Sequence, residues 1–234
     1  MPTDSAIAEH RAVQHAAQQV LEGLAATLHS EDTESSIVAR SAEALRTHGL
    51  TQTWYHDCLA LVLLGSRSCL SLSGRQYEPA SEAVGRWNLI TVDLSPARGD
   101  IWGDCARSFY VEEGCCRVQP RDPAFSRGKA FLGSLHAEML RFVTRATTFH
   151  QLFEWSVAKI SAAGFENLDF AGNVGHSIAT RREECQYIED GNHTHLSEVP
   201  FFTFEPHVRT VGGRWGFKHE DVFFFTADGR VAQL

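Results

Sequence analysis

The stretch that decides the fold lies between Leu89 and Phe109 and reads LITVDLSPARGDIWGDCARSF. An apolar run reaches Asp93, a turn containing Pro and Gly follows at residues 96–99, and a second strand-like run carries Asp104. Because side chains alternate between the two faces of a strand, a hairpin closed at this turn brings both carboxylates to one face. Two desolvated carboxylates repel each other unless a cation lies between them. The stretch therefore predicts an antiparallel hairpin that holds a pair of metal ions.

Three further potential metal ligands lie downstream of this hairpin. His176 follows a glycine in a short segment, Glu205 ends an apolar strand and precedes a proline, and Glu220 lies in the last hydrophobic strand. Together with the two aspartates they form a set of four carboxylates and one imidazole. Such an oxygen-rich set suits Mn, Co, Fe or Zn better than a metal that prefers thiolate ligands.

This order of two Asp, one His and two Glu resembles the pita-bread metallopeptidases, the family of methionine aminopeptidase, aminopeptidase P and prolidase. The resemblance covers essentially the whole chain. It implies an α+β pita-bread fold, with a curved and mainly antiparallel sheet and helices on its outer face. It also implies that two divalent ions are held by the five residues Asp93, Asp104, His176, Glu205 and Glu220.

The function implied by the resemblance is a dinuclear metal-dependent hydrolase that cleaves an amide or peptide bond. Its expected substrate is a small peptide or amino-acid derivative, cleaved in the manner of an Xaa-Pro peptidase or an N-terminal aminopeptidase. Glu205 is then both a metal ligand and the proton shuttle between the attacking water and the leaving amine. One alternative is a pita-bread binding module without catalysis, although such modules usually lose metal ligands. The other is a creatinase-like hydrolase of a non-peptide C–N bond, which metal content distinguishes because creatinase works without metal.

At two positions the sequence departs from the family pattern, and these departures narrow the range of expected substrates. A family histidine that steadies the substrate falls in register with Gln76, and a second family histidine falls on Glu183. Glutamine can donate a hydrogen bond but cannot carry a proton near neutral pH, and Glu183 adds negative charge where a donor is expected. We therefore expect a divergent member that acts on a small amide, an unusual dipeptide or a cationic substrate.

Other histidines can take over the missing role if this register is displaced. His56 lies in a segment that resembles the rim of the pocket for the substrate's first side chain, and it can equally be a surface residue. The remaining candidates are His193, His195 and His207.

The composition favours one catalytic domain over residues 1–234, since 43% of the residues are hydrophobic and can build a core. The net charge of −8 without a basic cluster argues against nucleic acid or an anionic membrane as a partner. The start of the sequence has no signal-peptide pattern, and the longest apolar run, Cys58–Leu64, is too short to span a bilayer. We expect a cytoplasmic protein with free thiols, and we leave a homodimer open.

Apolar periodicity and capping residues predict helices over residues 4–28, 33–49, 122–146 and 148–163. Residues 58–64 and 68–73 read as a hairpin closed by a glycine turn. Strands are predicted over residues 199–205 and 217–226.

Overall fold

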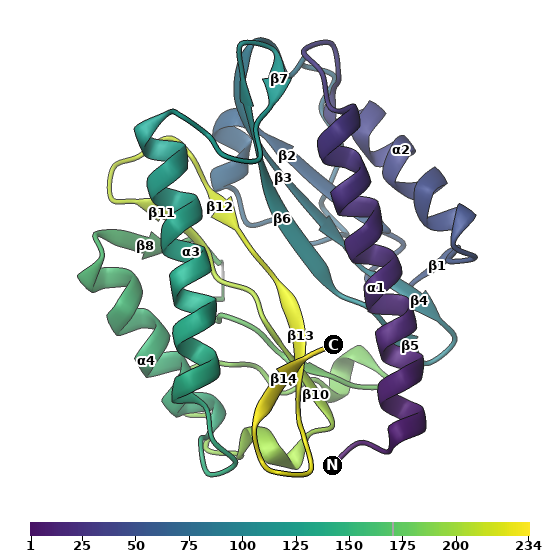
Figure 1. Ribbon diagram of the computed structural model, residues 1–234, viewed down its shortest axis with the longest axis vertical. Helices are drawn as coiled ribbons and strands as arrows, with labels where there is room; N and C mark the ends of the chain where they lie inside the picture. The colour runs from purple at the N-terminus through teal and green to yellow at the C-terminus, as the bar shows by residue number, and fades with distance from the viewer. Residues whose placement is uncertain (170) are drawn as a thin grey trace.

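The computed structural model describes residues 1–169 and 171–234, which form long helices packed on antiparallel sheets (Figure 1). The α-helices are α1 (Asp4–Thr27), α2 (Glu34–Thr47), α3 (Pro123–Phe142) and α4 (Phe149–Ala162). The short 3-10 helices are η1 (Gly65–Cys69), η2 (Arg182–Glu184) and η3 (Leu196–Glu198). The strands are β1 (Gln52–Thr53), β2 (Ala60–Leu64), β3 (Trp87–Leu94), β4 (Pro96–Arg98), β5 (Ile101–Trp102), β6 (Cys105–Glu112), β7 (Cys115–Cys116), β8 (Phe165–Asn167), β9 (Ser177–Ile178), β10 (Phe201–Phe204), β11 (His207–Thr210), β12 (Phe217–Lys218), β13 (Asp221–Phe225) and β14 (Val231–Gln233).

Each predicted helix is present and begins at a capping side chain. Thr3, Thr33 and Thr148 each accept a hydrogen bond from a backbone amide in the first turn, and Asp122 accepts two. These bonds satisfy amides that have no partner inside the helix. Local sequence therefore determines where the helices start.

The predicted hairpin around the two aspartates is also confirmed. Strand β3 pairs with β6 in antiparallel register, and β4 and β5 extend the tip. Asp93 lies opposite Ala106, so Asp104, two residues before Ala106, faces the same side of the sheet as Asp93. Strand β2 pairs with the other edge of β3 and places Leu61 opposite Asp93.

The second half of the chain forms two further antiparallel groups, ordered β14-β13-β10-β9 and β12-β11-β8. The predicted strand over residues 217–226 is divided into β12 and β13 around His219 and Glu220. Glu220 instead forms a bridge with Ala106, donating to its carbonyl oxygen at 3.0 Å. This bridge joins the first half of the fold, with the sheet of β2, β3, β6 and β7, to the second half, with the strands from β8 onward. Asp93 and Asp104 lie next to it, since Asp93 is paired with Ala106.

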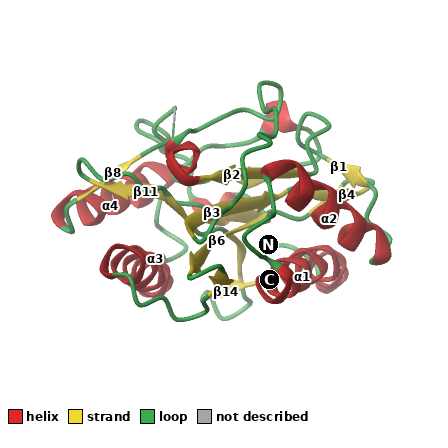
Figure 2. Ribbon diagram, turned by 90° about the horizontal axis from the view of Figure 1, so that it is seen from above, coloured by secondary structure: helices red, strands yellow, loops and turns green. Residues whose placement is uncertain are grey.

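The helices cover the sheets in two pairs, and each pair has its own apolar core. Seen from above, α1 and α3 lie on one side of β2, β3 and β6, with α2 and α4 toward the outer edges (Figure 2). One core, under α1 and α2, includes Val20, Ile37 and Val92, and the other, under α3 and α4, includes Leu132 and Phe202. The α+β class is confirmed. Within the described residues no helix has the length and apolarity needed to cross a bilayer.

The predicted hairpin of residues 58–64 and 68–73 is wrong in its second strand. After β2 the chain turns at Gly65, whose φ is 59°, and forms η1. Ser68 Oγ then accepts a hydrogen bond from the amide of Gly216 at 2.9 Å, and the Ser68 carbonyl oxygen lies 2.7 Å from His207 Nε2. These contacts hold the segment against the second half of the fold, so it does not return along β2.

Candidate functional site

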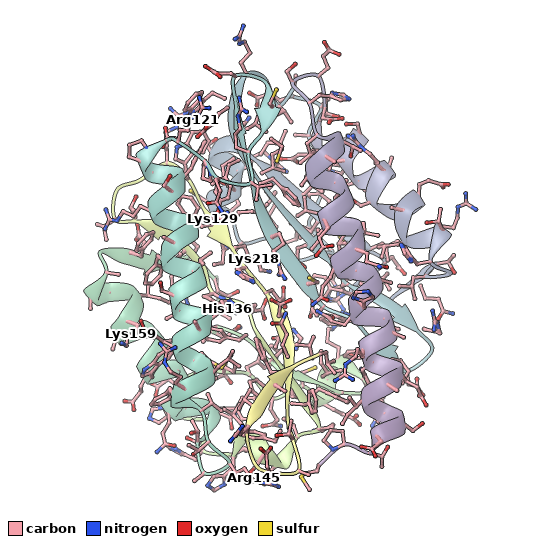
Figure 3. The ribbon with its side chains drawn as sticks, in the orientation of Figure 1. Arg121, Lys129, His136, Arg145, Lys159 and Lys218 are labelled. Carbon is pink, nitrogen blue, oxygen red and sulfur yellow. The ribbon has the colours of Figure 1, made fainter. Side chains whose placement is uncertain are left out.

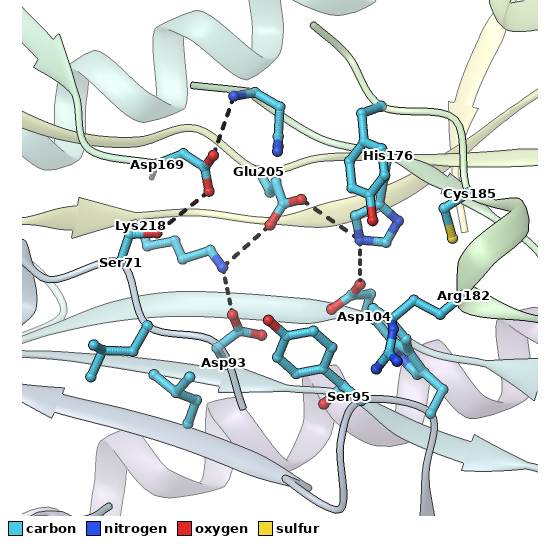
Figure 4. Close-up of a pocket in the computed structure, with 16 residues that line it drawn as sticks. Ser71, Asp93, Ser95, Asp104, Asp169, His176, Arg182, Cys185, Glu205 and Lys218 are labelled. Carbon is cyan, nitrogen blue, oxygen red and sulfur yellow. Dashed lines mark hydrogen bonds and ion pairs between the residues drawn. The ribbon is translucent and has the colours of Figure 1, made fainter. Parts of the chain in front are cut away.

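A cavity of about 150 Å³ lies between the two halves of the fold, and four of the predicted metal ligands line it (Figure 4). The fifth, Glu220, is fully buried next to them. Ligand atoms of Asp104, His176 and Glu220 all lie within 4.8 Å of one another. The cavity is lined by Trp54, Tyr55, Leu61, Ser71, Leu72, Asp93, Ser95, Asp104, Asp169, Asn173, His176, Arg182, Cys185, Tyr187, Glu205 and Lys218.

Each ligand stands in or at the end of a strand, so the sheets set their relative positions. Asp93 is in β3, Asp104 directly precedes β6, His176 directly precedes β9, and Glu205 directly follows β10. Glu220 occupies the break between β12 and β13. Five residues far apart in the sequence are thus brought together by antiparallel pairing and by the bridge between the two halves.

His176 is held in the orientation that a metal ligand needs. Its Nδ1 lies 3.0 Å from the Ser177 carbonyl oxygen, so an Nδ1–H donates there and leaves Nε2 for the cavity. Nε2 lies 3.3 Å from Asp104 Oδ2 and 3.7 Å from Glu205 Oε1. Burial by itself lowers the pKa of His176, but the hydrogen bond to Asp104 and the charge of Glu205 raise it well above its usual value.

The two most buried carboxylates among the predicted ligands, Asp104 and Glu220, have strongly shifted pKa values. Burial raises the pKa of Asp104 to about 6, in spite of the opposing hydrogen bond from His176. Burial, and next the negative charge of Asp104, raise the pKa of Glu220 well above its usual value. Neither oxygen of Glu220 has a hydrogen-bond partner, although both are buried. Buried acceptors without donors beside an imidazole nitrogen fit a bound divalent cation, since such a cation would satisfy them and keep them ionised.

Lys218 is a member of this site that the sequence reasoning did not single out. It comes from β12, between α1 and α3 in the view of Figure 3, and its side chain is 17% exposed. Its Nζ donates to Asp93 Oδ2 at 2.5 Å and lies 3.3 Å from Glu205 Oε2. Burial by itself lowers the pKa of Lys218, but the charges of Asp93, Glu220 and Glu205 raise it well above its usual value. The alternation that places Lys218 on the face of Glu220 is the sequence signal that could have identified it.

The three residues predicted to bind substrate are not among the described residues that line the cavity. Gln76 is exposed on a turn, and the side chain of Glu183 is 77% exposed. In η2 it is Arg182, not Glu183, that lines the cavity. His56 contacts Arg182, with its Nε2 2.7 Å from Arg182 Nη1. The other ring nitrogen of His56, Nδ1, accepts a hydrogen bond from Arg75.

The other histidines considered from the sequence lie elsewhere. His195 pairs with Glu198 at 3.0 Å on the surface, and the ring of His193 contacts that of His150. His207 is buried and bound to the Ser68 carbonyl oxygen. No His193, His195 or His207 side chain is among the described residues lining the cavity. The structure therefore offers no imidazole other than His176 within the described lining.

Aromatic side chains form one wall of the cavity. Trp54 stacks on Trp102 with ring centroids 4.8 Å apart, and its Nε1 donates to the Gly103 carbonyl oxygen at 3.0 Å. The same indole packs edge to face with the ring of His176, and the two ring centroids are 5.4 Å apart. This packing fixes the ring of His176 and gives the cavity an apolar side.

A second group of potential ligands, His136, His219 and Asp221, lies next to the site. Its carboxylate is already occupied: Arg107 Nη2 donates to both oxygens of Asp221 at 2.8 and 3.0 Å. The two imidazole rings are stacked with centroids 4.0 Å apart and planes 20° apart, so their in-plane lone pairs lie in two separate, nearly parallel planes. We interpret this group as a charge network that supports the start of β13, directly after Glu220.

Comparison with known proteins gives relatives over nearly the whole chain. The probable dipeptidase PepE of Mycobacterium tuberculosis is 24% identical over 201 residues, which are 86% of this chain and 49% of that protein. This chain thus spans about half the length of the curated relatives it matches.

Solved structures with the same fold include three peptidases. X-Pro aminopeptidase from Thermotoga maritima superimposes with a TM-score of 0.80 at 18% identity, covering 99% of this chain and 61% of that one. Dipeptidase PepE from Mycobacterium ulcerans gives 0.79 at 18% identity, covering 99% and 58%. Prolidase from Pyrococcus furiosus gives 0.76 at 16% identity, covering 100% and 64%. These likenesses confirm the predicted pita-bread fold.

Residues 8–227 match the family model for metallopeptidase family M24. The match includes all five predicted ligands and the strands that carry them. The chain therefore belongs to metallopeptidase family M24.

Proposed function

We propose that this chain is a divalent-metal-dependent hydrolase that cleaves an amide bond in a short peptide. The observation that carries the proposal is the carboxylate of Glu220, which is buried beside Asp104 and His176 without a hydrogen bond, while the Lys218 ammonium group lies 3.5 Å from its Oε2. A buried carboxylate without hydrogen bonds is costly, and a divalent cation is the partner that this donor set suits. The names of the relatives, which are dipeptidases, prolidases and X-Pro aminopeptidases, support a peptide substrate.

The residues that would hold divalent metal are Asp93, Asp104, His176, Glu205 and Glu220, with Mn, Co, Fe or Zn as the candidates. Bound metal of this kind lowers the pKa of a coordinated water and polarises a carbonyl group. The family resemblance predicts two ions. Whether both can bind depends on the ammonium group of Lys218, which lies against two of the same carboxylates, Asp93 and Glu205.

Glu205 is the residue that we assign to proton transfer. Its side chain is 18% exposed, so water entering the cavity can reach it, and Oε1 and Oε2 face His176 and Lys218 respectively. Glu205 would take the proton of the attacking water and deliver it to the leaving amine, as a general base and then a general acid. Trp54 and the rest of the apolar wall would limit access of bulk water to this transfer.

The cavity favours a small substrate. Its volume is about 150 Å³. That space accommodates the groups around one scissile bond. We therefore propose a short peptide or small amide, cleaved near one end, as the substrate.

The test combines a metal-by-substrate screen with one substitution. Protein freed of metal is reconstituted with Mn, Co, Fe or Zn and assayed on Met-peptides, Xaa-Pro dipeptides, longer Xaa-Pro peptides and small amides. We expect hydrolysis by the wild type and a loss of about 10²–10⁴-fold in Glu205→Gln, the typical contribution of general acid–base catalysis. Glu198→Gln, an exposed site, is the matched control. Wild-type turnover by Glu205→Gln would exclude Glu205 as the base, and no hydrolysis with any metal would contradict the function.

A further inference from the structure

The ammonium group of Lys218 lies inside the set of carboxylates that is expected to bind metal. Nζ is 2.5 Å from Asp93 Oδ2, 3.3 Å from Glu205 Oε2 and 3.5 Å from Glu220 Oε2. Three of the five predicted ligands thus already face one positive charge. Figure 4 shows this ammonium group between Asp93 and Glu205, while His176 lies between Glu205 and Asp104.

Lys218 is held in this position by its surroundings. Its backbone amide donates to Ser108 Oγ at 2.8 Å, and Ser108 Oγ donates back to the Lys218 carbonyl oxygen at 3.1 Å. Lys218 also pairs with His207 between β12 and β11. The side chain is only 17% exposed, so water hydrates the ammonium group poorly where it lies. Breaking its ion pairs would therefore leave buried charges without a partner.

A metal ion and this ammonium group compete for the same oxygens. Divalent ions of the candidate set bind carboxylate oxygens at about 2.0–2.2 Å, and an ion on Asp93 would therefore stand very near Nζ. A protonated lysine has three donors and no lone pair, so it cannot become a ligand of that ion. Two cations at such a distance in a buried site repel each other strongly.

The four predicted ligands other than Asp93 are grouped around His176. Asp104, His176 and Glu220 have ligand atoms within 4.8 Å of one another, and Glu205 Oε1 lies 3.7 Å from His176 Nε2. These four residues offer three carboxylates and one imidazole, which suffices to coordinate one ion.

We propose that Lys218 occupies the place of one of the two metal ions, so that the chain binds a single divalent ion through Asp104, His176, Glu205 and Glu220. Asp93 is then the ion-pair partner of Lys218 and not a metal ligand. This inference rests on the proposed metal-dependent function and revises the number of ions expected from the family resemblance.

The experiment measures metal content and not activity. Protein stripped with a chelator is dialysed against MnCl₂, and bound manganese is determined by elemental analysis and by electron paramagnetic resonance. The wild type should bind one ion with the spectrum of an isolated Mn(II). Lys218→Met, which keeps the unbranched stem but removes the ammonium group, should bind two ions with a spin-coupled spectrum. Lys159→Met on the surface of α4 is the matched control and should bind one.

Two further variants cover the case in which Lys218→Met does not fold. Lys218→Arg keeps the positive charge and should retain one ion, and Asp93→Asn should also retain one ion because Asp93 is not a ligand. Two coupled ions in the wild type, or loss of all manganese in Asp93→Asn alone, would overturn the role of Lys218 and leave the proposed function intact. Absence of bound manganese from every protein, the wild type included, would count against the metal-dependent function itself.

Discussion

The side chain of Gln14 in α1 exchanges two hydrogen bonds with the backbone of Asp104. Gln14 Nε2 donates to the Asp104 carbonyl oxygen at 2.7 Å, and Gln14 Oε1 accepts from the Asp104 amide at 2.9 Å. Gln14 is fully buried, so no water replaces either bond. The first helix therefore holds the backbone of a predicted metal ligand directly. Both the amide and the carbonyl oxygen of Asp104, the residue before β6, have a hydrogen-bond partner.

Gln14→Leu should destabilise the protein by about 2–6 kcal/mol, because it leaves two buried backbone groups unpaired at about 1–3 kcal/mol each. It should also weaken manganese binding, since Asp104 loses its support. Urea unfolding and a metal titration measure the two effects. Gln19→Leu, exposed on the same helix, is the control and should change the free energy of unfolding little. Equal stability of both variants would show that the paired bonds contribute nothing.

Gly175→Ala should displace His176. Gly175 has a φ of 152°, and a Cβ built there lies 2.5 Å from the Thr203 carbonyl oxygen, an atom of the β10 backbone. We expect a loss of at least about 2 kcal/mol in stability from this clash and the strained φ, together with weaker metal binding. Gly191→Ala shares a positive φ, 80°, but meets no atom within 4 Å, so it should cost only about 1 kcal/mol. Similar losses in the two variants would rule out the contact with Thr203 as the cause.

The charge network behind the site predicts an acid-dependent loss of stability. Burial tends to raise the pKa of Asp221, but its bonds to His219 and Arg107 lower it from 3.8 to about 2. A depressed folded-state pKa contributes stability above the unfolded value, and this contribution is lost as the pH falls from about 4 to 2. The loss amounts to about 2 kcal/mol. Asp221→Asn should therefore unfold with a shallower pH dependence in this range, whereas Asp100→Asn, at an exposed turn, should follow the wild type. Parallel pH profiles for Asp221→Asn and the wild type would contradict the assignment.

Arg182 provides a positive charge in a cavity whose other lining residues include Asp93, Asp104 and Glu205. Its side chain is 25% exposed and lines the cavity, which suits it to bind the C-terminal carboxylate of a short peptide. Arg182→Gln should raise KM about tenfold or more for such a peptide, since a charge-assisted hydrogen bond contributes about 1.5–3 kcal/mol. KM for the C-terminally amidated peptide should stay unchanged.

Arg181→Gln is the matched control for Arg182. Its side chain is 74% exposed and pairs with Glu184, so both KM values should equal those of the wild type. An equal rise of KM for the free and the amidated peptide in Arg182→Gln would show that Arg182 does not recognise the carboxylate.

The sequence by itself was enough to predict the hairpin of β3 and β6 with Asp93 and Asp104 on one face. It was also enough for the four helix starts. These features depend on local rules: alternation along a strand, a turn of Pro and Gly, and capping side chains such as Thr33. The order of the five ligand types pointed to the family because each ligand carries its own local context. Residues 68–73 show where local rules fail, since an apolar run after a glycine turn forms no strand when Ser68 is bound to Gly216.

Only the tertiary structure decided what faces the cavity. Lys218 and Asp93 are 125 residues apart, and their 2.5 Å contact depends on the bridge between Ala106 and Glu220 that joins the two halves. Likewise, η2 turns Arg182 into the cavity and leaves Glu183 in solvent, although the two are neighbours in the sequence. Neither outcome follows from periodicity, because the position of a charge in a buried site is set by the packing of several distant segments and by the cost of leaving that charge unpaired.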